Sequence, residues 1–270
     1  MMGKGSLIVY SVLLSLIAPL ASAAQHLTLT GSSTIAPLAL EIGKRFEQQN
    51  PGVRVDVQTG GSSRGVNDAR TGLADIGMVS RALHESEADL TAYTIAMDGV
   101  CMILHRDNSI DALSDDQIRD IYTGKIRNWR ELGGADLPIT VVNKAEGRST
   151  LELFLAYFGL KNSQIKASVV IGDNQQGIKT VVGNPGAIGY VSIGTAEFEE
   201  QNGSPIKRLP MNGIEASTAQ VRAGRFPLSR PLNLVTKGAP GELALRFIRF
   251  TQSPGVDDLV EGQFFVPLEH

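Results

Sequence analysis

Three short polar turns hold most of the side chains in this sequence that could bind a small ion. They contain glycine and hydroxyl residues and cover residues 32–34, 62–64 and 148–150. Each follows a strand-like pattern and precedes a helix-like one. Because the first amides of a helix lack partners inside the helix and carry the positive end of its dipole, such a turn is a suitable site for an anion.

The third turn also carries two positive charges. In VVNKAEGRST (residues 141–150), Lys144 and Arg148 flank a glycine just before the helical pattern. Arginine is well suited to hold two oxygens of an oxyanion. Ordinary helix capping is the alternative explanation, since Ser149 followed by Glu152 matches a capping box. Serine, threonine and glycine are common at helix starts in any protein, so a single turn does not decide between the two.

Strands and helices that alternate along the chain position these turns. We expect strands at residues 27–30, 53–57, 74–79, 100–104, 139–142, 187–191 and 232–236. We expect helices at residues 35–46, 66–72, 114–122, 151–158, 178–182 and 241–252, the third with a capping box of Ser114 and Gln117. This alternation predicts an α/β fold with largely parallel strands. Since ligands bind at the carboxyl ends of such strands, the three turns can converge on one oxyanion.

The first 23 residues have the pattern of a secretory signal peptide. Lys4 precedes an apolar run from Leu7 to Leu20, and Ala21-Ser22-Ala23 provides a cleavage signal. The run is too short to be preferred as a membrane anchor. No cysteine stands at the cleavage point, so we do not expect a lipid anchor. We therefore expect a soluble exported protein whose fold begins at residue 24.

The composition excludes several classes of function. The 270 residues are 42% hydrophobic and 20% charged, as in a globular protein with one large domain or two smaller ones. The formal net charge of −3 argues against nucleic acid as a partner, which needs a basic face. The four histidines are scattered without metal-ligand spacing, so we expect no metal site and no cofactor. The only cysteine, Cys101, lies in an apolar run and is expected to be a buried thiol.

Two enzyme motifs partly match these turns. The letters GSSRG around Ser63 fit the G-x-S-x-G pattern of serine hydrolases, with His105 or His270 as a downstream base. The motif follows only two strands, however, and neither histidine has a recognisable setting. A P-loop is rejected because Val142 stands where the motif needs glycine and Arg148 where it needs lysine.

Six segments together resemble the family of periplasmic phosphate-binding proteins, the substrate-binding components of the phosphate ABC transporter. In chain order they are GSSTIAPL, GGSSRGV, DIGMVSR, IRDIYTGKIRNWRELGG, the turn before LELF, and NPGAIGYVSIG. The resemblance implies a two-lobe periplasmic-binding-protein (type II) fold, with mixed sheets flanked by helices and the ligand in the interlobe cleft. It places residues 24–96 and 223–270 in lobe one and residues 97–222 in lobe two, after the signal peptide of residues 1–23.

The resemblance also implies which residues contact the anion. The first turn would contribute Thr34 and the backbone amide of Ile35, and the second Ser62 with Ser63 beside it. The complete set expected on these grounds is Thr34, Ile35, Ser62, Ser63, Ser80, Arg81, Lys144, Arg148, Ser149 and Thr150.

The third turn departs from the family pattern, which usually has an arginine, three further residues and then Ser-Gly-Thr. Here Lys144 stands for that arginine and Arg148 for the serine. Ser149 replaces the glycine, and Thr150 keeps the threonine. The arginine has thus moved to the start of the helix, where Arg148 is the leading charged contact, supported by Arg81 or Lys144.

A second departure concerns the choice of anion. Some family members have an aspartate where Ser80 stands; that carboxylate accepts a hydrogen bond from a protonated phosphate oxygen and repels sulfate. Many relatives instead have serine followed by arginine, as in Ser80-Arg81. Phosphate, sulfate and molybdate therefore remain open, with Glu146 or Asp173 as alternative acceptors.

By this resemblance we expect a non-enzymatic, monomeric periplasmic receptor. It would capture inorganic phosphate between its lobes and deliver it to an inner-membrane ABC permease. The alternatives are a receptor for another tetrahedral oxyanion and a secreted serine hydrolase that uses Ser63.

Overall fold

The structure is a computed structural model that describes residues 25–270. The predicted signal peptide, residues 1–23, therefore lies outside the described residues. Within the described part, no helix has the length and apolar character that crossing a membrane requires.

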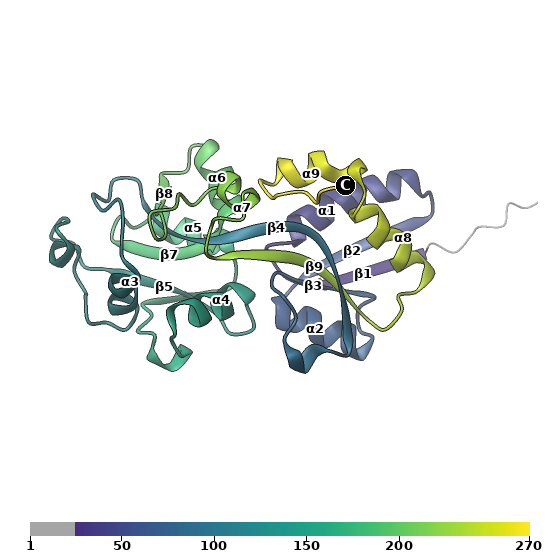
Figure 1. Ribbon diagram of the computed structural model, residues 1–270, viewed down its shortest axis with the longest axis horizontal. Helices are drawn as coiled ribbons and strands as arrows, with labels where there is room; N and C mark the ends of the chain where they lie inside the picture. Colours follow the sequence, from purple (N-terminus) through teal and green to yellow (C-terminus); the bar gives the residue numbers. More distant parts are fainter. Residues whose placement is uncertain (1–24) are drawn as a thin grey trace, which may run out of the picture.

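The polypeptide forms two α/β halves that lie side by side and are joined by two long strands, β4 and β9 (Figure 1). The first half has the strand order β2-β1-β3-β9-β4, and the second has β4-β7-β5-β6, with β8 paired to β4. The strands are β1 (Gln25–Gly31), β2 (Val53–Thr59), β3 (Ile76–Val79), β4 (Leu90–His105), β5 (Thr140–Lys144), β6 (Val169–Ile171), β7 (Ala187–Ser192), β8 (Ile206–Arg208) and β9 (Ser229–Lys237).

Helices flank these strands in both halves (Figure 1). The first half carries α1 (Ala36–Gln49), α2 (Ser62–Thr71), α8 (Glu242–Thr251) and α9 (Asp257–Gly262). The second half carries α3 (Asp115–Tyr122), α4 (Ser149–Phe158), α5 (Asn174–Val182), α6 (Ile193–Gln201) and α7 (Thr218–Arg222). The expected α/β fold with mixed sheets flanked by helices is confirmed, and so is the capping box of Ser114 and Gln117 at the start of α3.

The expectation of largely parallel strands is wrong for the connecting strands. β1 pairs parallel to β2 and β3, and β5 pairs parallel to β6 and β7. β4 and β9, in contrast, run antiparallel to each other and to β7 and β3 respectively. The physical reason is the path of the chain, which enters the second half through β4 and returns through β9, so the two strands must run in opposite directions.

Each half has its own hydrophobic core. One cluster combines residues from Leu27 to Ala96 with the segment from Leu232 to Phe265. The other spans Val100 to Leu228 and includes the buried, free thiol of Cys101. Phe226 and Leu228, which follow the proposed lobe boundary at residue 222, pack in this second cluster. The lobe limits at residues 96 and 222 remain a prediction.

Candidate anion-binding site

The three predicted turns meet at the seam between the two halves. The amide of Ser63 donates to the carbonyl of Gly147 at 3.2 Å, which joins the start of α2 to the turn before α4. Gly61 has a φ of +94°, and a Cβ there would lie 2.5 Å from the Gly147 oxygen. Backbone therefore packs directly on backbone across this seam, and only glycine fits at position 61.

The helices that start at this seam lack the caps found elsewhere. α1, α2 and α4 have no side-chain hydrogen bond from their N-cap residues within the described chain. In α3, α5, α6 and α7 the N-cap side chain accepts a hydrogen bond from an amide of the first turn. α8 and α9 also lack such a cap, but α1, α2 and α4 are the uncapped helices whose starts the sequence predicts to bind an anion. The positive ends of their dipoles make this seam electropositive.

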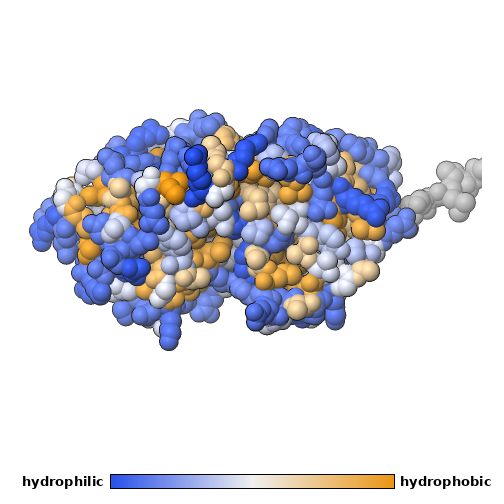
Figure 2. Space-filling view, in the orientation of Figure 1, coloured by the Kyte–Doolittle hydropathy of each residue, from blue (hydrophilic) through white to orange (hydrophobic). Residues whose placement is uncertain are grey.

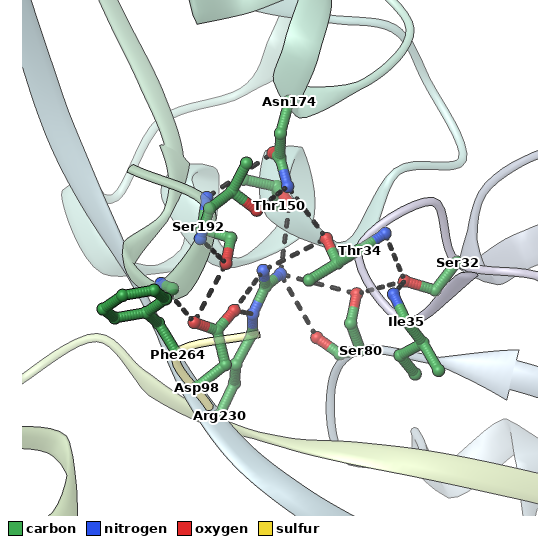
Figure 3. Close-up of polar contacts among 12 residues, drawn as sticks. Ser32, Thr34, Ile35, Ser80, Asp98, Thr150, Asn174, Ser192, Arg230 and Phe264 are labelled. Atoms are coloured by element: carbon green, nitrogen blue, oxygen red, sulfur yellow. Dashed lines mark hydrogen bonds and ion pairs between the residues drawn. The ribbon is translucent and has the colours of Figure 1, made fainter. Parts of the chain in front are cut away.

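Arg230 of β9 lies at the centre of the site (Figure 3). Its guanidinium is buried, and its Nε and Nη2 donate to Asp98 Oδ2 at 3.0 and 2.8 Å. The two residues are direct partners in the β4–β9 ladder. Asp98 Oδ1 also accepts from the Ser192 hydroxyl at 3.0 Å and from the amide of Gly194 at 3.3 Å. The carboxylate is thus fully used in holding the arginine and the start of α6.

The opposite edge of the same guanidinium contacts hydroxyls from both halves (Figure 3). Nη1 donates to Thr150 Oγ1 at 3.1 Å and to Ser80 Oγ at 3.4 Å, and Nη2 donates to Thr34 Oγ1 at 3.4 Å. Thr34 and Ser80 follow β1 and β3 of the first half, whereas Thr150 lies in α4 of the second. Arg230 therefore gathers the predicted hydroxyls around one buried positive charge.

Arg230 and Asp98 were not among the residues expected from the sequence. The available signal was Asp98 inside the apolar segment 95–104 and Arg230 inside segment 228–234, where three leucines are interspersed with polar residues. A charge in a buried strand needs a partner, because burial of an unpaired charge is very unfavourable. This signal indicates that each charge has a partner, but it does not identify the partner or place the pair at the anion site.

Lys144 contacts a residue that was also missed, Asn174. The ammonium of Lys144 is buried and donates to Asn174 Oδ1 at 2.9 Å. Burial lowers the pKa of Lys144 to about 7; nearby Asp173 opposes this effect, while Arg230 and Arg148 add to it. Asn174 in turn donates from Nδ2 to Thr34 Oγ1 at 3.3 Å, so it connects the lysine to the first turn (Figure 3).

Ser32 and Ser62 hold the first two turns together. Ser32 Oγ accepts from the amides of Thr34 and Ile35 at 3.2 and 3.4 Å and lies 3.0 Å from Ser80 Oγ. Ser62 Oγ accepts from the Ser80 amide at 3.2 Å. The Ile35 amide, expected to face the anion, thus makes only a long hydrogen bond within its own turn.

Arg148 and Ser149 present polar atoms that have no partner. Three buried side-chain polar atoms in residues 25–270 lack a hydrogen bond, and Arg148 Nε and Ser149 Oγ are two of them; the third is Thr30 Oγ1. Leaving such a group unsatisfied costs about 1–3 kcal/mol. Both atoms lie at the uncapped start of α4, where a ligand can satisfy them.

The predicted capping box of Ser149 and Glu152 is wrong. The N-cap of α4 is Arg148, and Ser149 is already inside the helix. Glu152 is used elsewhere: it accepts from Arg81 Nε at 2.5 Å and lies 3.2 Å from His84 Nε2. A tertiary ion pair thus replaces the local contact that the sequence pattern indicated.

Arg81 and Ser63 are engaged by carboxylates at the edge of the site. Arg81 pairs with both oxygens of Glu87, at 2.7 and 2.9 Å, in addition to Glu152. Ser63 Oγ donates to Glu152 Oε1 at 3.4 Å. Arg81 is therefore neutralised by two carboxylates.

The arrangement of a serine hydrolase is not formed around Ser63. Its hydroxyl contacts a carboxylate, whereas His105 accepts from the Asp107 amide and His270 lies beside Asp257. Without an imidazole beside it, Ser63 Oγ has no base to activate it. In the described chain, no cluster of three or more metal-ligating side chains is found either.

A pocket marks the mouth of the seam. It has a volume of about 260 Å³ and is lined by both halves, through Ser33, Ala36, Pro37, Leu40 and Thr59 on one side and Asp173, Asn174, Gln175 and Thr195 on the other. In the space-filling view the two halves meet along this seam, and the surface is indented at its lower edge (Figure 2). Asn174 in the pocket lining donates to Thr34 Oγ1, so the pocket borders the hydrogen bonds around Arg230.

Two α/β halves joined by paired strands, with a polar site between them, define a ligand-binding protein of the periplasmic type. The chain belongs to the PBP superfamily, since a model of a PBP superfamily domain matches residues 18–254.

Several known proteins are similar to this chain. It is 29% identical over 252 residues to phosphate-binding protein PstS of Bacillus subtilis. The matched region covers 91% of this chain and 82% of that protein. A putative phosphate ABC transporter substrate-binding protein from Clostridium perfringens, solved with bound phosphate, has a TM-score of 0.83 at 33% identity and covers 91% of this chain and 100% of that one. An ABC-type phosphate transport receptor from Vibrio cholerae has a TM-score of 0.74 at 28% identity, with 90% and 100% covered.

Proposed function

We propose that this protein is a periplasmic receptor that binds inorganic phosphate and delivers it to the permease of an ABC transporter. The observation that carries the proposal is the pair of unpartnered polar atoms, Arg148 Nε and Ser149 Oγ, at a seam where three uncapped helices meet. The names of the relatives in Bacillus, Clostridium and Vibrio support phosphate as the ligand.

The predicted contact residues take different roles in this proposal. Arg148 and Ser149 bind the anion directly, together with backbone amides at the helix starts of the seam. The hydroxyls supply further donors, from Thr34, Ser62, Ser80 and Thr150. The remaining residues of the predicted set, Ile35, Ser63, Arg81 and Lys144, stay predicted contacts, and Arg230 is added as the charge behind the hydroxyls.

The mechanism follows from the cost of removing an anion from water. A buried dianion is tolerated only when many donors replace its hydration shell. Residues 24–96 and 223–270, the proposed lobe one, and residues 97–222, the proposed lobe two, each contribute part of those donors. The ligand therefore stabilises the state in which the lobes are closed, and that closed shape is the one the permease recognises. The receptor binds and releases phosphate as a monomer without changing it.

Calorimetric titration of the processed protein with phosphate tests the proposal. We expect saturable binding at one site per chain, of micromolar affinity or tighter. Arg148→Ala should weaken binding at least tenfold, since a hydrogen bond to a charged group is worth about 1.5–3 kcal/mol. Arg64→Ala is the matched control, because Arg64 also lies at a helix start but pairs with Asp68 of its own helix. The affinity of the Arg64→Ala variant for phosphate should stay unchanged.

Two results would contradict this function. If phosphate gives no binding while another oxyanion binds tightly, the ligand is wrong. If a serine-directed phosphonate labels Ser63, or an ester is turned over, the protein is a hydrolase and not a receptor.

A further inference from the structure

A short segment after α9 connects the two halves in addition to β4 and β9. It leaves α9 of the first half, reaches toward α7 of the second half and then turns back (Figure 1). We propose that residues 264–266, here named the arm, stabilise the closed arrangement of the halves, and that Phe198 and Phe264 are positioning residues for the anion site. The inference rests on the proposed function and identifies residues outside the site that set the affinity of the receptor.

Phe264 stands at a position where a helix end usually has glycine. It is the second residue after α9, and its amide donates to the Glu261 carbonyl at 2.9 Å. The next amide, of Phe265, donates to the Val260 carbonyl at 3.1 Å. These two bonds form the Schellman motif, whose central residue takes a left-handed conformation. Phe264 has a φ of +57°, so its bulky side chain is strained there and contacts elsewhere have to compensate.

The second half supplies those contacts. The ring of Phe264 meets that of Phe198 of α6 edge to face, with the centroids 6.2 Å apart. Gly194, at the start of α6, lies so close that a Cβ there would be 2.7 Å from the Phe264 oxygen. Thr218 Oγ1 of α7 lies 2.8 Å from the same oxygen and also contacts the Glu197 carboxylate, so its single hydrogen serves two acceptors. The ring contact is therefore the clearest link from Phe264 to the second half.

The next two residues of the arm are divided between the two cores. Phe265 packs in the hydrophobic cluster of the first half, and Val266 packs in that of the second. Val266 also exchanges two backbone hydrogen bonds with Met97 of β4, each of 2.9 Å. Met97 directly precedes Asp98 in the chain. The arm is thus attached to β4 at the point where this strand passes from one half to the other.

The start of α6 connects the arm to the anion site. Gly194, which packs against the arm, donates its amide to Asp98 Oδ1 at 3.3 Å, and Asp98 holds Arg230. Arg230 in turn contacts Thr34 of the first half and Thr150 of the second. A shift of α6 away from the arm would therefore displace the charge that the site hydroxyls surround.

The contacts of the arm depend on the angle between the halves. Phe265 is buried in the core of the first half, whereas Phe198 and Gly194 belong to α6 of the second. Under the proposed lobe closure, opening separates α6 from the arm, and the ring contact is lost together with the ligand. A contact that is made only in the closed arrangement adds to the affinity for the ligand.

Calorimetric titration of Phe198→Ala with phosphate tests the inference. The substitution removes the ring contact and leaves the backbone of the arm unchanged, and the fold should tolerate it because Phe198 is 40% exposed. We expect the phosphate affinity to fall about two- to tenfold, as for the loss of one aromatic pair. Phe250→Ala is the matched control, because the ring of Phe250 contacts Phe46 at 5.4 Å inside the first half. Its phosphate affinity should stay unchanged.

Phe264→Gly separates positioning from stability. Glycine takes a positive φ without strain, so relief of strain offsets the lost ring contact in the thermal unfolding of the ligand-free protein. The helix end keeps its conformation whether the halves are open or closed, so phosphate affinity depends on the ring contact alone and should fall as in Phe198→Ala. The double variant should bind phosphate as each single variant does, because both substitutions remove the same contact.

Two results overturn the inference. Unchanged phosphate affinity in both single variants means that the arm serves only the fold of the first half. Losses that add up in the double variant mean that the two rings do not act through one contact. In either case the phosphate receptor stands, since the unaltered protein still binds its ligand. If the unaltered protein binds no phosphate, the proposed function fails, and the inference fails with it.

Discussion

Arg230 and Asp98 illustrate how a buried ion pair can organise a site. Both side chains are almost fully inaccessible, at 0% and 1% exposure. A pair of this kind gives little net stability compared with apolar residues of similar size, but loss of one partner leaves a buried charge. Its position on the ladder between β4 and β9 places the charge at the point where the two halves meet.

Removal of the arginine alone should therefore be more harmful than removal of the pair. Arg230→Met should lower the free energy of unfolding by about 3–5 kcal/mol, because Asp98 stays buried and charged. The double variant Arg230→Met/Asp98→Asn should lose clearly less. Urea unfolding followed by circular dichroism measures both. Equal losses would mean that the arginine contributes through packing and not through charge.

Lys144 should take up a proton when the anion binds. Burial lowers its pKa to about 7, so most of its amine is neutral at about pH 8. A bound dianion favours the charged form and raises this pKa, so binding near pH 8 draws in a fraction of a proton. Calorimetry in two buffers with different ionisation enthalpies measures that fraction, which should fall toward zero in Lys144→Met. Identical uptake in both proteins would remove the lysine from the site.

The burial of Lys144 also makes the free energy of unfolding depend on pH. Between about pH 7 and the ordinary lysine pKa, the unfolded chain holds more protons at this position than the folded one. The contribution of Lys144 to the free energy of unfolding therefore increases with pH through that window. It is lowest below about pH 7, where both states hold the proton. Bound phosphate reduces this dependence, since it compensates the charge.

Among the helices, α2 is positioned by the glycine that precedes it. Gly61 lets the start of α2 approach the turn before α4 until Ser63 and Gly147 share a hydrogen bond. Gly72, at the other end of α2, also has a positive φ, of +74°, but a Cβ there would meet nothing within 4 Å. Both glycines therefore have a positive φ, but only Gly61 has a neighbouring backbone that an added Cβ would meet.

Gly61→Ala should weaken phosphate binding by more than tenfold, because the added methyl keeps the two halves apart. Gly72→Ala should cost about 1 kcal/mol of stability through strain alone and leave affinity unchanged. Calorimetry and thermal unfolding of the two variants separate these effects. If both variants lose affinity equally, strain in α2 and not interlobe contact is the cause.

Within the described residues, charged side chains join the two halves at more than one place: Arg222 of α7 pairs with Glu261 of α9, and Glu152 lies at the anion site. Glu152 of α4 reaches across the seam to Arg81, Ser63 and His84 of the first half. Glu152 is not a predicted contact of the anion, so under the proposed lobe closure we expect its contacts to favour the closed shape before any ligand binds. Affinity then includes a contribution from this contact.

Glu152→Gln should weaken phosphate binding by about fivefold or more and increase the radius of gyration of the free protein in small-angle X-ray scattering. The loss of one charge-assisted contact corresponds to about 1–3 kcal/mol. Glu41→Gln is the control, because Glu41 pairs with exposed Lys44 within α1 and its removal should change neither quantity. An unchanged affinity in Glu152→Gln would show that closure depends on the ligand alone.

Local patterns in the sequence determined much of this protein. Alternating segments predicted the α/β class, and the turns at residues 32–34, 62–64 and 148–150 marked the helix starts that meet at the seam. The capping box of Ser114 and Gln117 was also readable, because its contact closes within one helical turn. These features depend on residues close together in the chain, so short-range periodicity and turn chemistry suffice to predict them.

Tertiary structure alone decided the partners of the charged residues. Asp98 and Arg230 are 132 positions apart, and Asn174 and Thr34 are 140 apart. Glu152, which the local pattern assigned to Ser149, turned instead to Arg81, 71 positions away. Charges removed from water take whichever partner the packing brings nearest. That partner depends on the path of β4 and β9 between the halves, which no local pattern records.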